Sequence, residues 1–317
     1  MAKTKKSAGK IIATIAIIFF SSIIILFALF IITLNIFKFS YYNEYYDSLT
    51  KVCKNPGLKD GYVPQGITYK DGYYFTTGYM KEDEPSRIYK TNAEEDSIYV
   101  TLTSEGRDFY GHTGGLQYAN DKFYLANEGL GVFIFDASLL DNIENGDMVE
   151  IGSPYMVNNH SSFVFSDDEY LYVGEFNNDA KYQTENEVQF NHKTHKAIVT
   201  KYNFDDLDTP LAVYSIPNEI QGFCVLDDGT IVLSRSYSVT SSNFFIYEED
   251  DIQDTWSTYN GAPLYFLDEP TRNIKGPSMS EDLDVVDGKV ITLFESACKK
   301  YFYGNLFGAT YIASLDF

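Results

Sequence analysis

The segment QGITYKDGYYFTTGY (65–79) decides the fold, because its pattern recurs four more times along the chain. An apolar run leads to a turn pair, and a second apolar run follows it, as the two strands of a tight hairpin require. The turn pair Asp71-Gly72 tolerates the positive φ angles of such hairpins. The other copies are GGLQYANDKFYLANE (114–128), SSFVFSDDEYLYVGE (161–175), QGFCVLDDGTIVLSR (221–235) and EDLDVVDGKVITLFE (281–295).

Further strand candidates lie between these hairpins, and no helical periodicity appears after residue 45. The candidates are 87–90 with 97–103, 131–135, 197–204 with 211–216, and 244–248 with 263–267. Two inner and two outer strands per repeat make one blade of a β-propeller. We therefore predict an all-β fold, a five-bladed β-propeller with four-stranded blades. A β-sandwich or an open meander is the alternative, but neither gives a reason for a fixed hairpin repeat.

The two ends of the propeller are predicted to meet in its last blade. Only 34 residues follow Leu283, which is enough for a second inner strand and one outer strand at 309–315. The missing strand would come from the N-terminal stretch 45–53. Closing the ring in this way removes two exposed sheet edges.

An uncharged apolar run of 27 residues, 11–37, precedes the repeats. It exceeds the roughly 20 residues that cross the hydrocarbon core of a bilayer. Four lysines precede the run and one follows it, which favours a cytoplasmic N-terminus. We predict a single-pass protein of the cell membrane, with a cleaved signal peptide as the alternative. Its parts are a cytoplasmic basic tail (1–10), a transmembrane signal anchor (11–37), a linker (38–44) and an extracellular propeller domain (45–317).

The charge of the chain excludes nucleic acid as a partner. The 317 residues hold 24 basic and 45 acidic side chains. Five of the bases and none of the acids lie in the first forty residues, so the remainder carries a net charge of −26. Binding to a phosphate backbone needs a basic surface instead.

The repeat also predicts which side chains meet at one face. The first strand of each hairpin lines the channel of a propeller, so its start and the end of the second strand lie together. The residues placed there are Gln65, His112, Glu128, His160, Glu175, Gln221, Arg235, Glu281, Asp282 and Glu295. The positions just inside are small, as crowding at an axis requires, at Gly66, Gly115, Ser162 and Gly222. The fifth repeat has Asp282 at that position.

This mouth is mostly acidic, and Arg235 is its one fixed cation. Crowded carboxylates either hold a cation such as Ca²⁺ or provide an acid and a base with separated pKa values. The register places Glu175 opposite His160, which suits a general base oriented by a carboxylate. The alternative is a structural plug whose polar groups bind blade backbone and water. A functional mouth predicts that Glu175→Gln or Glu281→Gln impairs ligand or Ca²⁺ binding more than folding stability.

Several of these residues belong to an ordered set of motifs. The set is PQG (64–66), GHTGG (111–115), SF with VGEF (162–163 and 173–176), QG (221–222), and MSEDL with LFESACKKY (279–283 and 293–301). It resembles an uncharacterised family of secreted or membrane-anchored propeller-like proteins from Gram-positive bacteria, over residues 60–305. The resemblance implies the fold and the location but no activity. It marks Gln65, His112, Glu175, Gln221, Glu281 and Glu295, whereas Asp282 stands where relatives often have Gly.

Two classes of function follow. The first is a binding module that captures a small ligand, a glycan or a peptide at the acidic mouth. The second is an extracellular hydrolase of a lactone, a glycoside or a phosphoester, with or without calcium. Neither a nucleophile motif nor a full metal-ligand set is found, which favours the binding module. Cys53 and Cys298 are both predicted near the closing blade. A disulfide between them is one alternative for a protein outside the cell, and two free thiols are the other.

Overall fold

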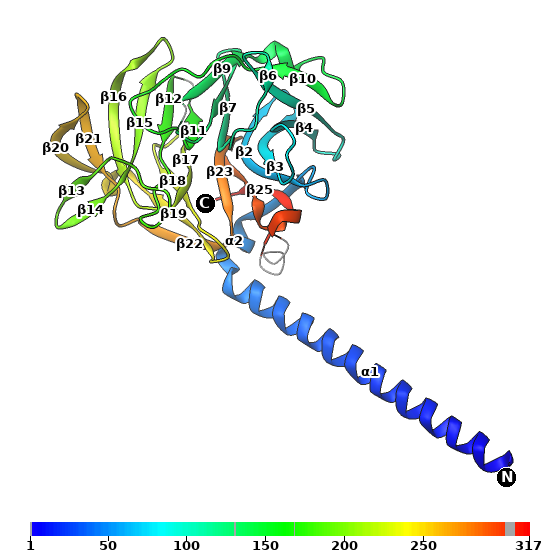
Figure 1. The fold of residues 1–317 in the computed structure, drawn as a ribbon. Helices are drawn as coiled ribbons and strands as arrows, with labels where there is room; N and C mark the ends of the chain where they lie inside the picture. The colour runs from blue at the N-terminus through cyan, green and yellow to red at the C-terminus, as the bar shows by residue number, and fades with distance from the viewer. Residues whose placement is uncertain (1, 130, 168, 302–307) are drawn as a thin grey trace.

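The computed structural model describes residues 2–129, 131–167, 169–301 and 308–317. The chain forms a five-bladed β-propeller, from which one long helix projects (Figure 1). Each of the five 15-residue segments forms the two innermost strands of one blade. Turn residues Asp71, Asn120, Asp121 and Asp287 all have positive φ, as the hairpin pattern predicts. Asp168, in the third turn pair, lies outside the described residues.

The blades follow one another in chain order. Blade 1 holds β2 (Tyr62–Lys70), β3 (Tyr73–Met80), β4 (Arg87–Asn92) and β5 (Ser97–Ser104). Blade 2 holds β7 (Gly115–Ala119), β8 (Lys122–Ala126) and β9 (Val132–Asp136). Blade 3 holds β11 (Phe163–Ser166), β12 (Tyr170–Gly174), β15 (Ala197–Asn203) and β16 (Asp206–Ile216). Blade 4 holds β17 (Ile220–Val225), β18 (Ile231–Arg235), β19 (Ser242–Tyr247) and β22 (Arg272–Gly276). Blade 5 holds β23 (Ser280–Val286), β24 (Lys289–Phe294), β25 (Tyr311–Leu315) and β1 (Leu49–Lys54).

The outer strands depart from a uniform four per blade. Within the described residues, blade 2 has three strands, and an isolated bridge from Val132 to Tyr155 stands in place of a fourth. Blade 1 gains β10 (Asp147–Glu150), which runs parallel to β5, and a short β6 (Arg107–Asp108). Blade 3 gains β21 (Ala262–Phe266) and β20 (Gln253–Tyr259). A separate hairpin is formed by β13 (Val188–Phe190) and β14 (Lys193–His195). Short 3-10 turns lie at η1 (Ala137–Leu140), η2 (Glu249–Asp251) and η3 (Glu295–Ala297).

The predicted pairing of 244–248 with 263–267 is wrong. Strand β19 pairs with β22, whereas β21 pairs in parallel with β16 of blade 3. The reason is packing, because Leu264 and Phe266 are buried against Ile198 and Val213 of that blade. The segment therefore follows its apolar partners rather than its nearest neighbour in sequence.

The predicted closure of the ring is confirmed for β1. It pairs antiparallel with β25, from Leu49 opposite Leu315 to Lys54 opposite Tyr311. The closing strand begins at Leu49 rather than at residue 45, because Asn43–Ser48 forms the short helix α2. The cysteines near this blade, Cys53 and Cys298, are buried and free, so they do not form a disulfide here.

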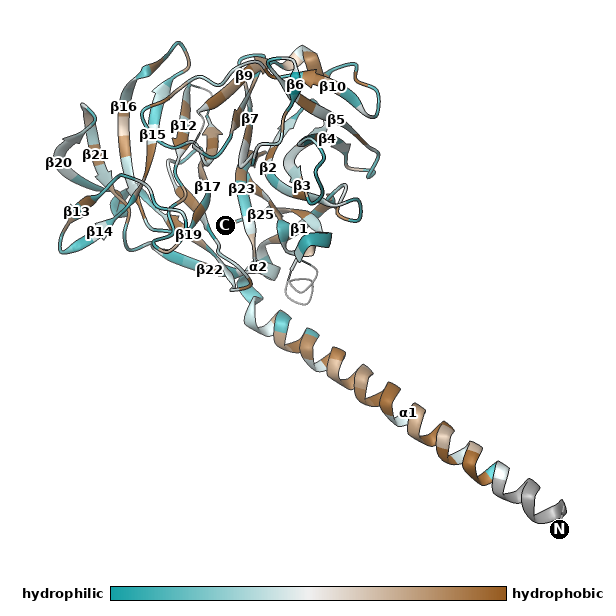
Figure 2. Cartoon of the chain, in the orientation of Figure 1, coloured by the Kyte–Doolittle hydropathy of each residue, from teal (hydrophilic) through white to brown (hydrophobic). Residues whose placement is uncertain are grey.

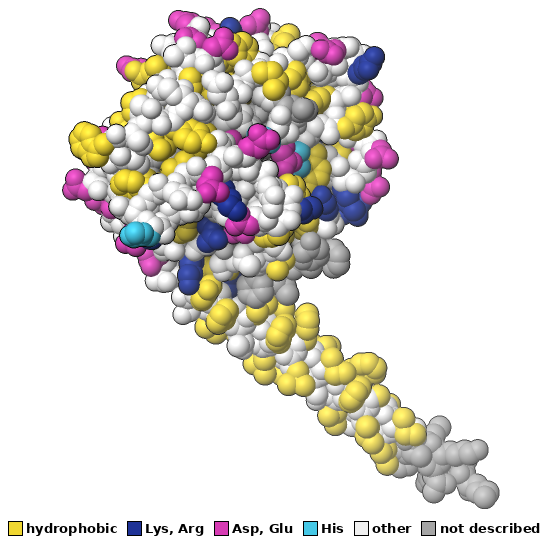
Figure 3. Space-filling view, turned by 60° about the vertical axis from the view of Figure 1, so that its left-hand side comes forward, with side chains coloured by type: hydrophobic (Ala, Val, Ile, Leu, Met, Phe, Trp, Pro, Cys, Tyr) yellow, Lys and Arg dark blue, Asp and Glu magenta, His cyan; other side chains and the backbone are white. Residues whose placement is uncertain are grey.

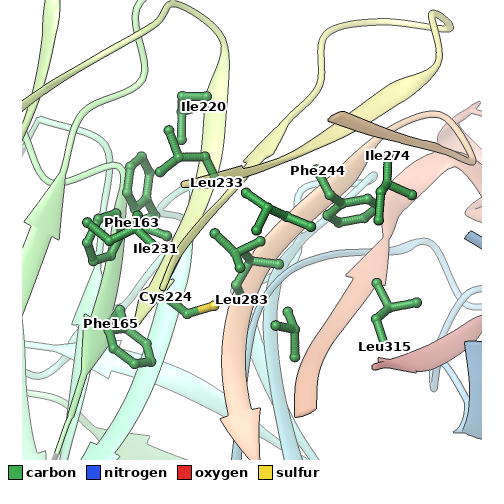
Figure 4. Packing of buried hydrophobic residues seen from close by; sticks show 14 of the residues in the cluster. Phe163, Phe165, Ile220, Cys224, Ile231, Leu233, Phe244, Ile274, Leu283 and Leu315 are labelled. Atoms are coloured by element: carbon green, nitrogen blue, oxygen red, sulfur yellow. The ribbon is translucent and has the colours of Figure 1, made fainter. Parts of the chain in front are cut away.

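The apolar core lies between the blades. The largest cluster joins blades 3, 4 and 5, and Figure 4 shows its side chains meeting. Phe163 and Phe165 come from β11, Leu233 and Phe244 from blade 4, and Leu283 from β23. Apolar side chains on facing sheets interdigitate in this way when neighbouring blades stack. This packing between blades therefore holds the first residues of the innermost strands in fixed positions around the axis.

Helix α1 (Ala2–Tyr41) projects from the head as a continuous rod. Its apolar span, Gly9–Tyr41, is long enough to cross a membrane, and its side chains do not pack against the propeller over most of that length. Figure 2 shows that hydrophobic residues predominate along this span. The residues predicted as a linker, 38–44, are almost entirely helical, being shared between α1 and α2.

Candidate functional site

A pocket of about 230 Å³ opens at the end of the propeller where the innermost strands begin. Five of the ten residues placed at the mouth line it, namely Gln65, His112, Glu128, Gln221 and Glu295. The other lining residues are Gly114, Ser162, Phe176, Lys181, Tyr182, Ser236, Tyr237, Ser238, Met279 and Tyr301. All five blades therefore contribute to one concave site.

Small residues at the axis allow the strands to converge beneath this pocket. A Cβ on Gly66 would lie 2.7 Å from the carbonyl carbon of Gly115. A Cβ on Gly115 would lie 2.6 Å from the backbone nitrogen of Val164, and one on Gly222 would lie 2.8 Å from that of Leu283. These distances are too short for any side chain, so the crowding expected at the axis is present.

Asp282 closes the axis below the pocket. Its Oδ2 accepts hydrogen bonds from the backbone N–H of Ile67 at 3.2 Å and of Leu116 at 3.1 Å. These donors belong to blades 1 and 2, so one carboxylate joins three blades. Burial raises the pKa of Asp282 well above its usual range. Asp282 does not line the pocket, and its contacts are those of a structural plug.

Two further side chains extend this plug. The Oδ2 of Asp284 accepts from the Oγ1 of Thr68 at 2.8 Å, and burial raises the pKa of Asp284 to about 6. The amide of Gln117 donates to the carbonyl of Leu283 at 3.3 Å and accepts from the backbone N–H of Ser166 at 3.4 Å. Side chains thus satisfy backbone groups where the innermost strands do not pair with one another.

Glu295 lines the pocket and forms a carboxylate pair, here named the floor pair, with Glu281, which is buried and does not line the pocket. Burial raises the pKa of Glu281 well above its usual range, and the nearby charge of Glu295 adds to the rise. Burial also raises the pKa of Glu295, although Lys300 and the amide of Gln65, which donates to it at 2.9 Å, oppose that rise. Two such carboxylates cannot both ionise at low cost, so the pair holds a proton near neutral pH.

His112 and Glu128 occupy another part of the wall. The side chain of His112 is exposed at the pocket, although the wall around it partly desolvates the ring, which lies 4.7 Å from the ring of Tyr79. This desolvation, with the positive charge of Lys300, lowers the pKa of His112 to about 4, so the imidazole is neutral at pH 7. Partial desolvation raises the pKa of Glu128, while His160 and Lys181 oppose the rise.

Glu175 lies outside the pocket and has structural partners. Its oxygens accept from the amide of Asn186 at 2.7 and 2.8 Å, and from the backbone N–H of His160 and Ile198 at 3.0 and 3.2 Å. Complete burial raises the pKa of Glu175 to about 7. The expected contact with the His160 imidazole is replaced by one with its backbone, because the residues around His160 form a loop rather than a strand. The exposed ring of His160 is therefore not oriented by Glu175.

Arg235 is also placed elsewhere. Its guanidinium pairs with Glu219 at 2.8 Å and donates to the carbonyl of Asn218 at 3.1 Å, so its charge is already neutralised. Lys181 is the cation that lines the pocket. Lys300 lies nearby, where its ammonium donates a hydrogen bond to the hydroxyl of Tyr79 at 2.6 Å. The mouth is therefore less acidic than the sequence alone suggested.

Sequence reasoning missed the aromatic part of the wall, formed by Phe176, Tyr182, Tyr237 and Tyr301. Phe176 lies 5.7 Å from the ring of Tyr182 and 6.3 Å from that of Tyr237. The sequence held a signal for part of this wall. The repeats used to define the mouth end at Glu175 and Arg235, and the next residues, Phe176 and Ser236, both line the pocket. Extending the repeat by two residues finds Tyr237 as well.

No group of three His, Cys, Asp or Glu side chains that fits a metal ion occurs in the part of the chain that the structure describes. The carboxylates expected to share a cation are divided among the floor pair, the axial plug, the Glu175 site and Glu128 on the pocket wall. The structure therefore gives no support for a calcium site at the mouth.

The comparisons with known proteins concern the fold. No protein-family model matches the sequence, and no curated protein does. A glutaminyl cyclase from Myxococcus xanthus is 9% identical with a TM-score of 0.44, over 85% of this chain and 97% of the other. A GH43_1 enzyme from Xanthomonas citri is 10% identical with a TM-score of 0.45, over 84% and 89%. The WD40 β-propeller domain of Doa1 is 10% identical with a TM-score of 0.38, over 84% and 96%. These values are too low to carry an activity to this chain.

Proposed function

We propose that the pocket binds one small neutral polar molecule, of the size and chemistry of a single sugar ring at the end of a glycan. Its volume of about 230 Å³ is below the roughly 300–1,000 Å³ of sites for drug-sized ligands. A peptide of several residues does not fit such a volume.

The composition of the wall carries this proposal. Gln221, Ser162 and Ser238 line the pocket, and within the described residues their side chains make no hydrogen bond. They are therefore available to ligand hydroxyls, beside the aromatic surface of Phe176 and Tyr237. Glu128 and Lys181 bring opposite charges to the wall, so it favours neither an anion nor a cation. Hydrogen-bonding groups opposite aromatic faces match a sugar, which has polar edges and a partly apolar face.

The test is calorimetric titration of the full-length chain in detergent micelles with neutral hexoses and N-acetylhexosamines, beside dipeptides and nucleosides. We expect at least one sugar to bind and Gln221→Ala to weaken that binding about tenfold, the effect of one lost hydrogen bond. Gln189→Ala, at an exposed position of β13, is the matched control and leaves binding unchanged. Binding of dipeptides alone, or of no sugar, would contradict the proposal.

A second candidate, glycoside hydrolysis, is favoured by the floor pair. A carboxyl group that keeps its proton near neutral pH suits a general acid, and Glu295 has this character. Glu128 lines the same pocket and would act as the second carboxylate, since glycosidases use two. Release of nitrophenol from nitrophenyl glycosides is the assay. Hydrolysis abolished by Glu295→Gln, but retained by Glu187→Gln on the surface, would establish the enzyme.

The location is part of the same proposal. We infer that α1 anchors the chain in the cell membrane as a single span, with the propeller outside the cell. The lysines before residue 11 and the apolar span support this orientation. The ordered motifs around Gln65, His112 and Glu281 also support membership of the secreted or membrane-anchored family that they resemble.

A further inference from the structure

The junction between α1 and the propeller is built from packed side chains. Tyr45 of α2 is completely buried, with ring centroids 6.2 Å from Phe244 and 6.1 Å from Phe294. The hydroxyl of Tyr42 is hydrogen-bonded to the Oγ of Ser241 at 3.0 Å, and the ammonium of Lys38 donates to the carbonyl of Gly308 at 3.0 Å. These contacts hold the end of the anchor against blades 4 and 5.

The segments that hold this junction also line the pocket. Ser236, Tyr237 and Ser238 line it, and the same loop ends at Ser241, the partner of Tyr42. The described parts of the connection from β24 to β25 also reach both places, because Tyr301 lines the pocket and the carbonyl of Gly308 accepts a hydrogen bond from Lys38. The anchor therefore leaves the head on the face where the pocket opens.

The helix geometry brings this face close to the bilayer. Tyr42 lies five residues beyond Phe37, the last residue of the apolar run, which is about 8 Å along a helix. The headgroup layer on each side of the hydrocarbon core is about 5–8 Å thick. The edge of the head at Tyr42 and Ser241, on the side where the pocket opens, thus lies at the level of the lipid headgroups when α1 spans the membrane.

The distribution of charge agrees with this orientation. The hairpin turns of the blades lie at the opposite face and are acidic, with exposed Asp71, Asp121, Asp227 and Asp287. Near the anchor, the ammonium of Lys275 lies 5.1 Å from the ring centroid of Tyr41. On the face that Figure 3 shows, most Lys and Arg side chains lie in the half of the head nearer α1, with acidic ones among them, and acidic side chains are more frequent at the far end. A membrane with anionic lipids attracts the first surface and repels the second.

We propose that the pocket takes its ligand from the membrane surface, as the sugar headgroup of a glycolipid in the same bilayer. This inference rests on the proposed sugar site and adds the source of the sugar. A headgroup that stands a few ångströms above the hydrocarbon reaches a pocket held at that level. A soluble sugar has to enter between the head and the bilayer.

The orientation is tested first, on the full-length chain reconstituted in phosphatidylglycerol–phosphatidylcholine vesicles. A fluorophore is attached to Ser238→Cys at the pocket or to Asp228→Cys at the far face, while the buried native cysteines limit background labelling. We expect lipids with a nitroxide on the headgroup to quench the Ser238 label several-fold more than the Asp228 label. A flexible Gly/Ser insertion between Phe39 and Ser40 should bring the two closer to equality. Equal quenching without the insertion would overturn the inference.

The source of the ligand is tested by displacement of a labelled hexose, chosen as the sugar that binds in the calorimetric titration. A glycosyl-diacylglycerol with that hexose, placed in the same vesicle as the protein, should displace the label at least tenfold better than the glycolipid in separate vesicles. If the hexose binds but the same-vesicle glycolipid does not displace it, the membrane source is wrong and the sugar site stands. If neither a hexose nor an N-acetylhexosamine binds, both the sugar site and its membrane source are wrong.

Discussion

Asp282 is the residue on which the centre of the propeller depends. Three other repeats have glycine at the equivalent position, and this one carboxylate lies where their strands converge on the axis. It accepts from two buried backbone N–H groups of other blades, which would otherwise have no partner from the strands themselves. A single side chain therefore substitutes for strand pairing at the axis.

Replacing this carboxylate should destabilise the whole fold. We expect Asp282→Ala to lower the free energy of unfolding by roughly 2–6 kcal/mol, because two buried donors lose their acceptor. Asp282→Asn keeps one acceptor oxygen and should lie closer to the wild type. Urea denaturation followed by circular dichroism measures both. Asp316→Ala, which removes only an exposed ion pair with Lys289, is the control. A fully stable Asp282→Ala variant would show that the bridge is dispensable.

Glu175 should make stability depend on pH in a predictable direction. Its pKa is about 7 in the folded chain, above the value of about 4.3 for an unfolded glutamate. Between these values the folded state binds more protons than the unfolded state, so stability falls as pH rises. Glu175→Gln removes this dependence. We expect the stability difference between wild type and variant to shift by up to about 3 kcal/mol in favour of the variant from pH 5 to pH 8.

Melting curves of both proteins at several pH values test this expectation. The surface variant Glu187→Gln should follow the wild type throughout. A difference between wild type and Glu175→Gln that stays constant from pH 5 to pH 8 would show that Glu175 ionises normally in the folded chain.

Among the elements, β1 is the strand that joins the N-terminal part of the chain to the last blade. Its six residues complete the last blade and cover the edge of β25. Cys53 of β1 also packs with Ile67 of blade 1 and Ile312 of blade 5, so the strand seals the joint between the two ends of the ring. Without it, β25 would present unpaired backbone groups to solvent.

Removing this strand should therefore cost more than removing the anchor. A chain that begins at Asn55 is expected to melt several degrees below one that begins at Phe39, and to aggregate through β25. Both chains lack most of α1, so the comparison isolates α2 and β1. Thermal melts and light scattering provide the measurement. Equal melting temperatures would mean that the ring closes without β1.

For the whole molecule, the C-terminal end of α1 is packed against the propeller rather than joined to it by an extended linker. Residues 38–48 are almost entirely helical and are packed against blades 4 and 5. The head therefore stays close to the membrane surface from which α1 emerges. The side of the membrane on which the head lies then determines which ligands can reach the pocket.

This orientation leads to a topology prediction. Protease added to intact cells that express the chain should degrade the propeller, because the lysines before residue 11 favour a cytoplasmic N-terminus. Immunoblotting for a C-terminal tag follows the loss. A cytoplasmic marker protein must survive the same treatment. If the head is protected until the cells are permeabilised, the orientation is reversed.

The sequence by itself determined the features that rest on local periodicity. Alternating apolar residues around Asp-Gly or Asn-Asp turns specify hairpins, and their fixed length and number specify a ring of blades. The 27-residue apolar run likewise indicates a membrane span without any knowledge of the fold. Even the crowding at Gly66 and Gly115 could be predicted, since strands that converge on an axis leave no room for side chains.

Only the tertiary structure decided which polar residues at the mouth face the pocket and which support the fold. Asp282 and Leu116 are 166 positions apart, and Glu175 is satisfied by Asn186 from a loop with no repeat counterpart. Burial and hydrogen-bond partners depend on such distant contacts, whereas a repeat pattern reports only the position along a strand. The same reason explains why the docking of α1 beside the pocket had no signal in the sequence. Tyr42 and Ser241 meet across 199 positions, and nothing local to either residue records the other.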